Sequence, residues 1–116
     1  MSKNLKMSLL LDFYGQLLTP RQRDIMELYY YEDLSLSEIS EHKEITRQGV
    51  HECIKHSEKI LAEFEQKLQL ADRFSKLNSS LEEILKTAQN IQSSGKSVSD
   101  GISHIIETAE KAQEFI

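Results

Sequence analysis

The chain has 116 residues, of which 39% are hydrophobic, and its formal net charge at pH 7 is −5. This length fits one domain, or one compact domain with an appended helical arm, and a single proline with four glycines favours long helices. No apolar run approaches the roughly 20 residues that span a bilayer, and the apolar N-terminal stretch contains Asp12, so neither a membrane protein nor a secretory signal is expected. The single cysteine, Cys53, cannot form an internal disulfide, which fits a cytoplasmic location.

Residues 5–18 and 20–31 are predicted to form the first two helices. Thr19 is a good N-cap, Pro20 suits the first helical position, and Gln22 completes a capping box. Three consecutive tyrosines lie near the end of the second helix. They could stack on nucleic-acid bases, but we expect their rings to pack inside with the hydroxyl groups at the rim.

A helix-turn-helix motif is predicted over residues 34–61. Ser35 and Glu38 form a capping box that begins a short helix, and Thr46 is an N-cap for a second one. Apolar or small residues then recur at helical spacing within an arc of about 100°. These are Val50, Cys53, Ile54, Ser57, Leu61, Phe64 and Leu68. A polar face with basic and amide side chains near the helix N-terminus is typical of major-groove readers, and here it holds Arg47, Gln48, His51, Glu52 and Lys55.

Three segments carry a family resemblance: LTPRQR at residues 18–23, LYYYEDLSLSEIS at residues 28–40 and ITRQGVHECIKHSEKIL at residues 45–61. They resemble the helix-turn-helix of the fourth conserved region of bacterial sigma factors. The whole chain resembles the small YlxM-type helix-turn-helix proteins associated with the signal recognition particle.

The resemblance implies an all-α fold with a sigma-factor-like helix-turn-helix domain over residues 1–68 and a C-terminal helical hairpin over residues 69–116. It also implies a DNA-binding face. Arg47, Gln48 and His51 would read base edges, with Glu52 further along the same face. Lys55 or Lys59 would meet phosphates.

Two residues in the turn depart from the family pattern. The position that usually carries glycine, because the backbone there is left-handed, holds Glu44, which costs about 1–2 kcal/mol if the conformation is kept. The preceding position, usually apolar, holds Lys43. These substitutions favour a reshaped turn, which would tilt the second helix away from the usual docking angle.

The apolar pattern changes register after Leu68. The following apolar residues keep helical spacing but point to the opposite side of a straight continuation. We therefore expect that the helix breaks, either at residues 68–73 or at residues 78–80, where two serines offer capping boxes, or that it leaves the core and meets another partner. The residues concerned are Leu70, Phe74, Leu77, Leu81, Ile84, Leu85, Ala88 and Ile91.

The segment Ser93-Ser94-Gly95 predicts a turn, and residues 98–115 a last helix, so that the end of the chain forms an αα-hairpin. An apolar row as long as the one after Leu68 needs a cover, which predicts a homodimer built largely from residues 69–116. The last helix aligns Ile102, Ile105, Ile106, Ala109, Ala112 and Ile116.

No phosphate-binding glycine loop, nucleophile elbow or paired-cysteine motif is present in the sequence, so neither an enzyme nor a cofactor is expected. His51, Cys53 and His56 are close in sequence, but on a helix His51 points roughly 140–160° away from the other two, so no shared metal ion is expected. His104 points away from the apolar face of its helix, and we expect it to be solvated.

The acidity of the chain weakens a DNA-binding interpretation. Residues 1–70 hold nine Lys and Arg against twelve Asp and Glu, whereas DNA-binding domains usually have a basic face. The favoured function is a regulator that binds double-stranded DNA. The second is a protein- or RNA-contacting accessory factor of the signal recognition particle without sequence-specific DNA binding. The third is a purely structural dimerising module.

Overall fold

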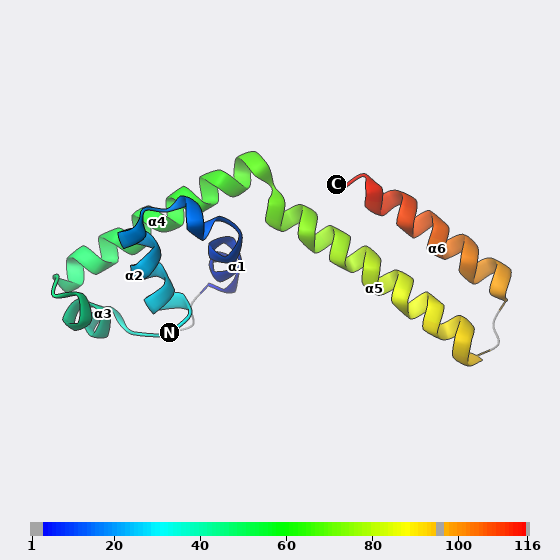
Figure 1. Ribbon diagram of the computed structural model, residues 1–116, viewed down its shortest axis with the longest axis horizontal. Helices are drawn as coiled ribbons and strands as arrows, with labels where there is room; N and C mark the ends of the chain where they lie inside the picture. Colours follow the sequence, from blue (N-terminus) through cyan, green and yellow to red (C-terminus); the bar gives the residue numbers. More distant parts are fainter. Residues whose placement is uncertain (1–3, 95–96, 116) are drawn as a thin grey trace. The chain divides into compact units, whose positions relative to one another are not determined.

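The computed structural model describes residues 4–94 and 97–115, and its regular structure there is helical throughout, which confirms the all-α class. Two of the positions used above, Gly95 and Ile116, lie outside the described residues. The chain forms two compact units, residues 1–71 and 72–116. In chain order (Figure 1) the elements are α1 (Leu5–Tyr14), a 3₁₀ turn (Gly15–Leu17), α2 (Pro20–Tyr30), α3 (Leu36–Lys43), α4 (Arg47–Leu68), α5 (Leu70–Ser94) and α6 (Val98–Gln113).

Local capping signals place the helix starts of the first unit. The Thr19 hydroxyl accepts the Gln22 N–H at 3.2 Å, and the Gln22 side chain accepts the Thr19 N–H at 3.0 Å. Ser35 and Glu38 form the same reciprocal pair at the start of α3, at 3.1 and 3.0 Å. Both predicted capping boxes are therefore confirmed, and each satisfies backbone donors that have no partner inside the helix.

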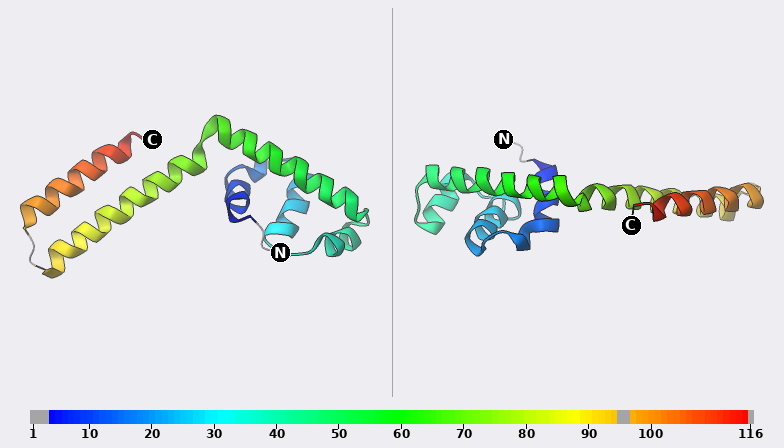
Figure 2. Two further views of the ribbon diagram at one scale, coloured as in Figure 1. Left: turned by 180° about the vertical axis from the view of Figure 1, so that it is seen from behind. Right: turned by 90° about the horizontal axis from the view of Figure 1, so that it is seen from above.

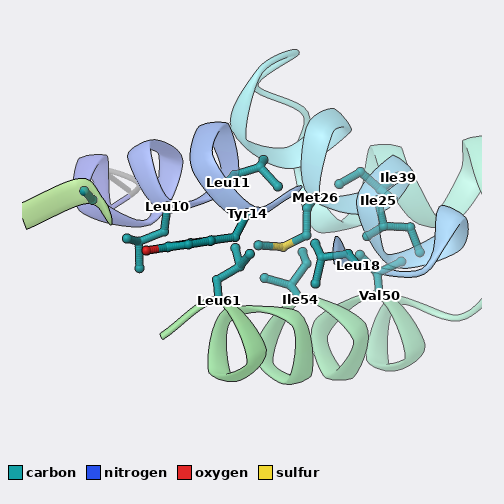
Figure 3. Packing of buried hydrophobic residues seen from close by; sticks show 11 residues of the cluster. Leu10, Leu11, Tyr14, Leu18, Ile25, Met26, Ile39, Val50, Ile54 and Leu61 are labelled. Carbon is teal, nitrogen blue, oxygen red and sulfur yellow. The ribbon is translucent and has the colours of Figure 1, made fainter. Parts of the chain in front are cut away.

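Helix α4 is the element against which the rest of the first unit packs. Helices α1, α2 and α3 each contact it (Figures 1 and 2). Its buried row faces side chains from all three helices, and in Figure 3 Val50, Ile54 and Leu61 point toward the others. Because so many apolar groups meet on one helix, its rotation about its own axis is fixed by the core. The cluster also contains Leu10, Leu11, Tyr14, Leu18, Ile25, Met26 and Ile39.

A part-buried polar network closes the far end of α4. The Tyr14 hydroxyl donates to the Glu65 carboxylate at 2.6 Å and accepts the Leu70 N–H at 3.0 Å. The same Glu65 oxygen accepts the Ala71 N–H at 3.0 Å. Between the two helices Gln69 is left-handed, with φ 56° and ψ 30°. The Tyr14–Glu65 network therefore satisfies two backbone donors in the first turn of α5.

The helix break predicted at residues 68–73 is confirmed at Gln69, and the alternative at residues 78–80 is wrong. Helix α5 runs through those residues without interruption. There the Asn78 side chain reaches Glu82, four residues along the same helix, at 3.5 Å. A capping box is thus a permissive signal, which a chain that packs as a continuous helix does not use.

In the second unit α5 and α6 run antiparallel as a hairpin (Figure 1). Near the turn, a Cβ at Gly101 would lie 2.3 Å from Ile91 Cδ1, so the helices approach closely there. Midway, His104 is exposed as expected, and its Nε2 lies 2.8 Å from Glu83 Oε1. At the far end Lys76 Nζ lies 5.8 Å from the centroid of the Phe115 ring.

Replacing Tyr14 with phenylalanine should lower the free energy of unfolding by about 1–2 kcal/mol at pH 7, because the Leu70 N–H loses its partner in a part-buried position. Urea unfolding followed by circular dichroism measures the change. Tyr31→Phe is the matched control: its hydroxyl bonds Asp12 at an exposed site, so the loss should stay below about 0.5 kcal/mol. Equal losses in the two variants would contradict a special role for the Tyr14–Glu65 network.

The same network predicts a response to alkaline pH. Burial, and then the hydrogen bond to Glu65, raise the pKa of Tyr14 above its ordinary value of 10.0. Because the folded chain holds this proton more tightly, its contribution to stability is complete below pH 10 and declines as the pH rises further. Unfolding titrations between pH 8 and 11 should therefore show a smaller loss of stability for Tyr14→Phe than for the unaltered chain.

Candidate nucleic-acid interface

Helices α3 and α4 form the predicted helix-turn-helix, joined by residues 44–46. Thr46 caps α4 as expected, since its hydroxyl accepts the Gly49 N–H at 2.9 Å. A Cβ at Gly49 would lie 3.1 Å from the Thr46 hydroxyl oxygen, so the glycine leaves room for this cap. The Thr46 hydroxyl and the absence of a side chain at Gly49 therefore together hold the first turn of α4 in place.

The turn keeps the left-handed conformation despite its unusual residue. Glu44 has φ 56° and ψ 41°, so the expected reshaping of the turn is wrong. Two bonds hold the conformation: the Ser40 hydroxyl donates to the Ile45 carbonyl at 2.6 Å, and the Ile45 N–H donates to the Ser40 carbonyl at 3.2 Å. Lys43 forms an ion pair with Asp24 of α2, which explains how a charged residue replaces an apolar one there.

Because Glu44 pays the steric cost of a left-handed backbone, Glu44→Gly should raise the free energy of unfolding by about 1 kcal/mol. Glu44→Gln is the control, since it removes the charge but keeps the Cβ, and its stability should match that of the unaltered chain. Chemical denaturation of the three proteins makes the comparison. An equal gain in both variants would assign the effect to charge and not to the backbone.

The six predicted site residues all lie exposed on α4. Five of them recur along one side of the helix, and Arg47 lies in its first turn. On the opposite side Val50, Ile54 and Ser57 are buried against the core. The structure thus brings together the whole predicted set, namely Arg47, Gln48, His51, Glu52, Lys55 and Lys59.

Several of these side chains already have partners. Gln48 Nε2 donates to Glu52 Oε1 at 3.2 Å. Lys55 Nζ lies 3.6 Å from Glu58 Oε1, so part of its charge is neutralised. Within the part of the chain that the structure describes, the Arg47 and Lys59 side chains make no ion pair. Among the six site residues, Arg47 and Lys59 are therefore the cations whose charge is fully available to an anionic partner.

The tyrosine cluster is engaged within the domain, as expected from packing. Tyr30 is half-buried and its hydroxyl donates to Glu58, while the Tyr31 hydroxyl donates to Asp12 of α1. Burial, followed by the bond to each carboxylate, raises the pKa of both tyrosines above the ordinary value. The rings of Tyr29 and Tyr30 meet edge to face at 5.0 Å. Helix α2 thus uses its tyrosines to join α1 and α4.

The surroundings of the α4 N-terminus are mixed in charge. Exposed carboxylates at Glu38, Glu41 and Glu44 belong to α3 and the turn. Beside the turn lies a hollow of about 420 Å³ that contains Arg21, a cation that we did not single out from the sequence. Arg21 is far from α4 in the sequence. Its place in the segment LTPRQR, which carries the family resemblance, is the one sequence signal that could have identified it. The hollow is lined by Pro20, Arg21, Asp24, Ile25, Lys43 and Ile45.

Among residues 4–94 and 97–115, no group of three His, Cys, Asp or Glu side chains is placed to hold a metal ion. Over the same ranges no helix is both long and apolar enough to cross a membrane. Cys53 is half-buried and packs against the core cluster.

Comparison with known proteins gives one consistent family. A family model described as "UPF0122: Putative helix-turn-helix protein, YlxM / p13 like" matches residues 1–102. A UPF0122 protein of Desulforamulus reducens is 47% identical over 88 residues, which cover 76% of this chain and 75% of the relative. One from Acetivibrio thermocellus is 47% identical over 100 residues, or 86% of each chain. One from Shouchella clausii is 42% identical over 92 residues, covering 79% of this chain and 84% of the relative.

Proposed function

Since the chain belongs to the UPF0122 family of YlxM/p13-like helix-turn-helix proteins, we propose that it binds double-stranded DNA in the cytoplasm and regulates transcription. The N-terminal half of α4 would enter the major groove. One observation carries this proposal: the polar row of α4 is exposed along its whole length, while the opposite row is fixed in the core. A rigid helix with one free polar face is what base reading requires.

Each side chain has a chemical role that follows from its donors and acceptors. Arg47 can donate two bonds to guanine, Gln48 can pair with adenine, and Glu52 can accept from cytosine. The Gln48–Glu52 bond holds these two side chains in one orientation before DNA arrives. His51 lies beside them on the same side of the helix, where it would contact a base edge or a phosphate. Lys59, with Lys55, would meet the phosphate backbone.

A second candidate function is supported by the charge around the turn. Glu38 and Glu41 of α3 and Glu44 of the turn are exposed in the half of the motif that precedes α4, and duplex DNA bound to the motif would meet this negative charge. An accessory role in the signal recognition particle through protein contacts avoids this repulsion, whereas an RNA partner, like DNA, would have to bind away from these carboxylates. In that role the chain would present the same helix-turn-helix surface to its partner without reading a base sequence.

Selection of DNA from a random duplex library, followed by affinity measurement, tests the first proposal. Arg47→Ala and Gln48→Ala should each weaken binding to the selected duplex by about 1–3 kcal/mol, because each removes contacts to a base edge. Lys67→Ala is the control, since it removes an exposed charge from the far end of the same helix. Val50→Asp should instead unfold the domain, because an unpaired charge would enter the core.

Affinity for the selected duplex across a salt series measures how many phosphates the chain contacts. With few unpaired cations on α4, we expect a shallow slope that corresponds to about two to four phosphate contacts per subunit. If no duplex is enriched, or if Arg47→Ala binds the selected duplex as well as the unaltered chain does, the DNA-reading role is wrong. Binding to signal-recognition-particle RNA or protein, measured in the same series, would then support the second candidate.

A further inference from the structure

The hairpin of the second unit uses only one row of each helix to hold itself together. On α5, Ile84, Thr87 and Ile91 are partly covered, and on α6, Thr108 and Ala112 are buried. These residues recur at spacings of three and four, so they form a single face of each helix. The contact at Gly101 continues this face toward the turn. Of the apolar row predicted after Leu68, the hairpin therefore covers only part.

The remaining large apolar residues form a second row on each helix. Four of them follow a partly covered residue by one position, as Leu85 follows Ile84 and Ile106 follows Ile105, which is a rotation of roughly 100°, and the other two lie on the same side at helical spacing. Because the two helices run antiparallel, equal rotations bring both rows to the same side of the hairpin. We call this side the apolar face. Its members are 48–58% exposed: Phe74, Leu81, Leu85, Val98, Ile102 and Ile106.

The opposite side of the hairpin carries most of its charge. Most residues one position before the contact row are ionisable on both helices, and Glu83 and His104 pair across it at 2.8 Å. The hairpin is thus amphipathic as a unit, with an apolar face and a charged face. The charged face contains Lys76, Glu83, Lys86, Asp100, His104, Glu107 and Lys111.

The size of the apolar face fits a protein partner of equal size. Six such side chains, each half exposed, present about 100 Å² apiece, or about 600 Å² for one hairpin. A patch of this size is at the upper limit for a monomer. Two facing hairpins would bury about 1,200 Å², which reaches the range of stable protein interfaces.

The rim of the apolar face indicates which partner this is. A helix that lies on a membrane carries several lysines and arginines along its edge, whereas among the described residues only Lys86, about 20° from Ser75 around α5, borders the rim here. The rim carries two carboxylates and otherwise uncharged amides and hydroxyls, so two copies can meet with little repulsion. The rim residues are Ser75, Asn78, Glu82, Gln89, Ser99, Ser103, Glu110 and Gln113.

We propose that the apolar face binds the same face of a second copy of this chain. Two hairpins then form a four-helix bundle, with residues 69–116 as the dimerisation element and the charged faces turned outward. The proposal stands independently of the DNA partner, since it uses none of the α4 site residues. A two-fold dimer would also present two copies of α4.

Sedimentation of the full-length chain tests the proposal. The unaltered protein should sediment at micromolar concentration as a dimer of the 13.4 kDa chain. Leu85→Glu or Ile106→Glu should weaken self-association by at least about 100-fold, because an unpaired carboxylate would be buried between the copies. Ser79→Glu is the control, since it adds the same charge at an exposed position away from the apolar face. Circular dichroism checks that each variant keeps its helices.

Disulfide trapping tests the same face without adding a charge. In a Cys53→Ala background, Leu85→Cys places a thiol in the middle of the apolar face, where a two-fold axis brings the two copies closest. This variant should form covalent dimers on mild oxidation, and Ser79→Cys should not. A monomeric unaltered chain, or equal cross-linking of the two cysteine variants, would overturn the proposal. The apolar face would then be covered by the chain's own first unit or by a different protein.

Discussion

The packing of one row of α4 against three helices is the constraint on which the first unit depends. Val50, Ile54 and Leu61 are almost fully buried, and each faces side chains from other helices. Because opposite faces of a helix are fixed relative to each other, burying this row also determines which residues of α4 face outward. The candidate DNA-binding face is thus a consequence of core packing. A substitution in the core would therefore shift the candidate DNA-binding residues of α4 without altering any of them.

Polar interactions complete what apolar packing leaves undetermined. The core fixes the rotation of α4, while the Tyr14–Glu65 network fixes where it ends and satisfies the backbone donors that follow. At the other end, the Ser40 hydroxyl and Thr46 cap perform the same task. Hydrophobic burial alone would not fix the backbone at the two ends of α4, and each of these bonds does so. The helix-turn-helix geometry therefore depends on a few polar contacts at the two ends of one well-packed helix.

Local chemistry predicted the helix starts of the first unit but not the continuity of α5 through residues 78–80, and features that depend on distant partners were not predictable. The capping boxes at Thr19 and Ser35 involve residues three apart, so the sequence alone identifies them. The Glu44 turn was misjudged because bonds from Ser40, and an ion pair between Lys43 and α2, hold it. The division of the hairpin into a contact row and an apolar face was also missed, since both rows share one broad helical pattern. The grouping of the α4 site residues followed directly from helical periodicity, whereas Arg21 needed the fold.

The close approach at Gly101 restricts how the hairpin can align. Antiparallel helices with repeated apolar residues can often slide past each other by one turn and still bury similar surfaces. Here Ile91 occupies the space where a side chain at position 101 would be. Sliding α6 by one turn would bring Val98 or Ile105 to that place, and either side chain would collide with Ile91. A single glycine thus selects one alignment among several of comparable hydrophobicity, so the hairpin has one structure and not a set of interchangeable ones.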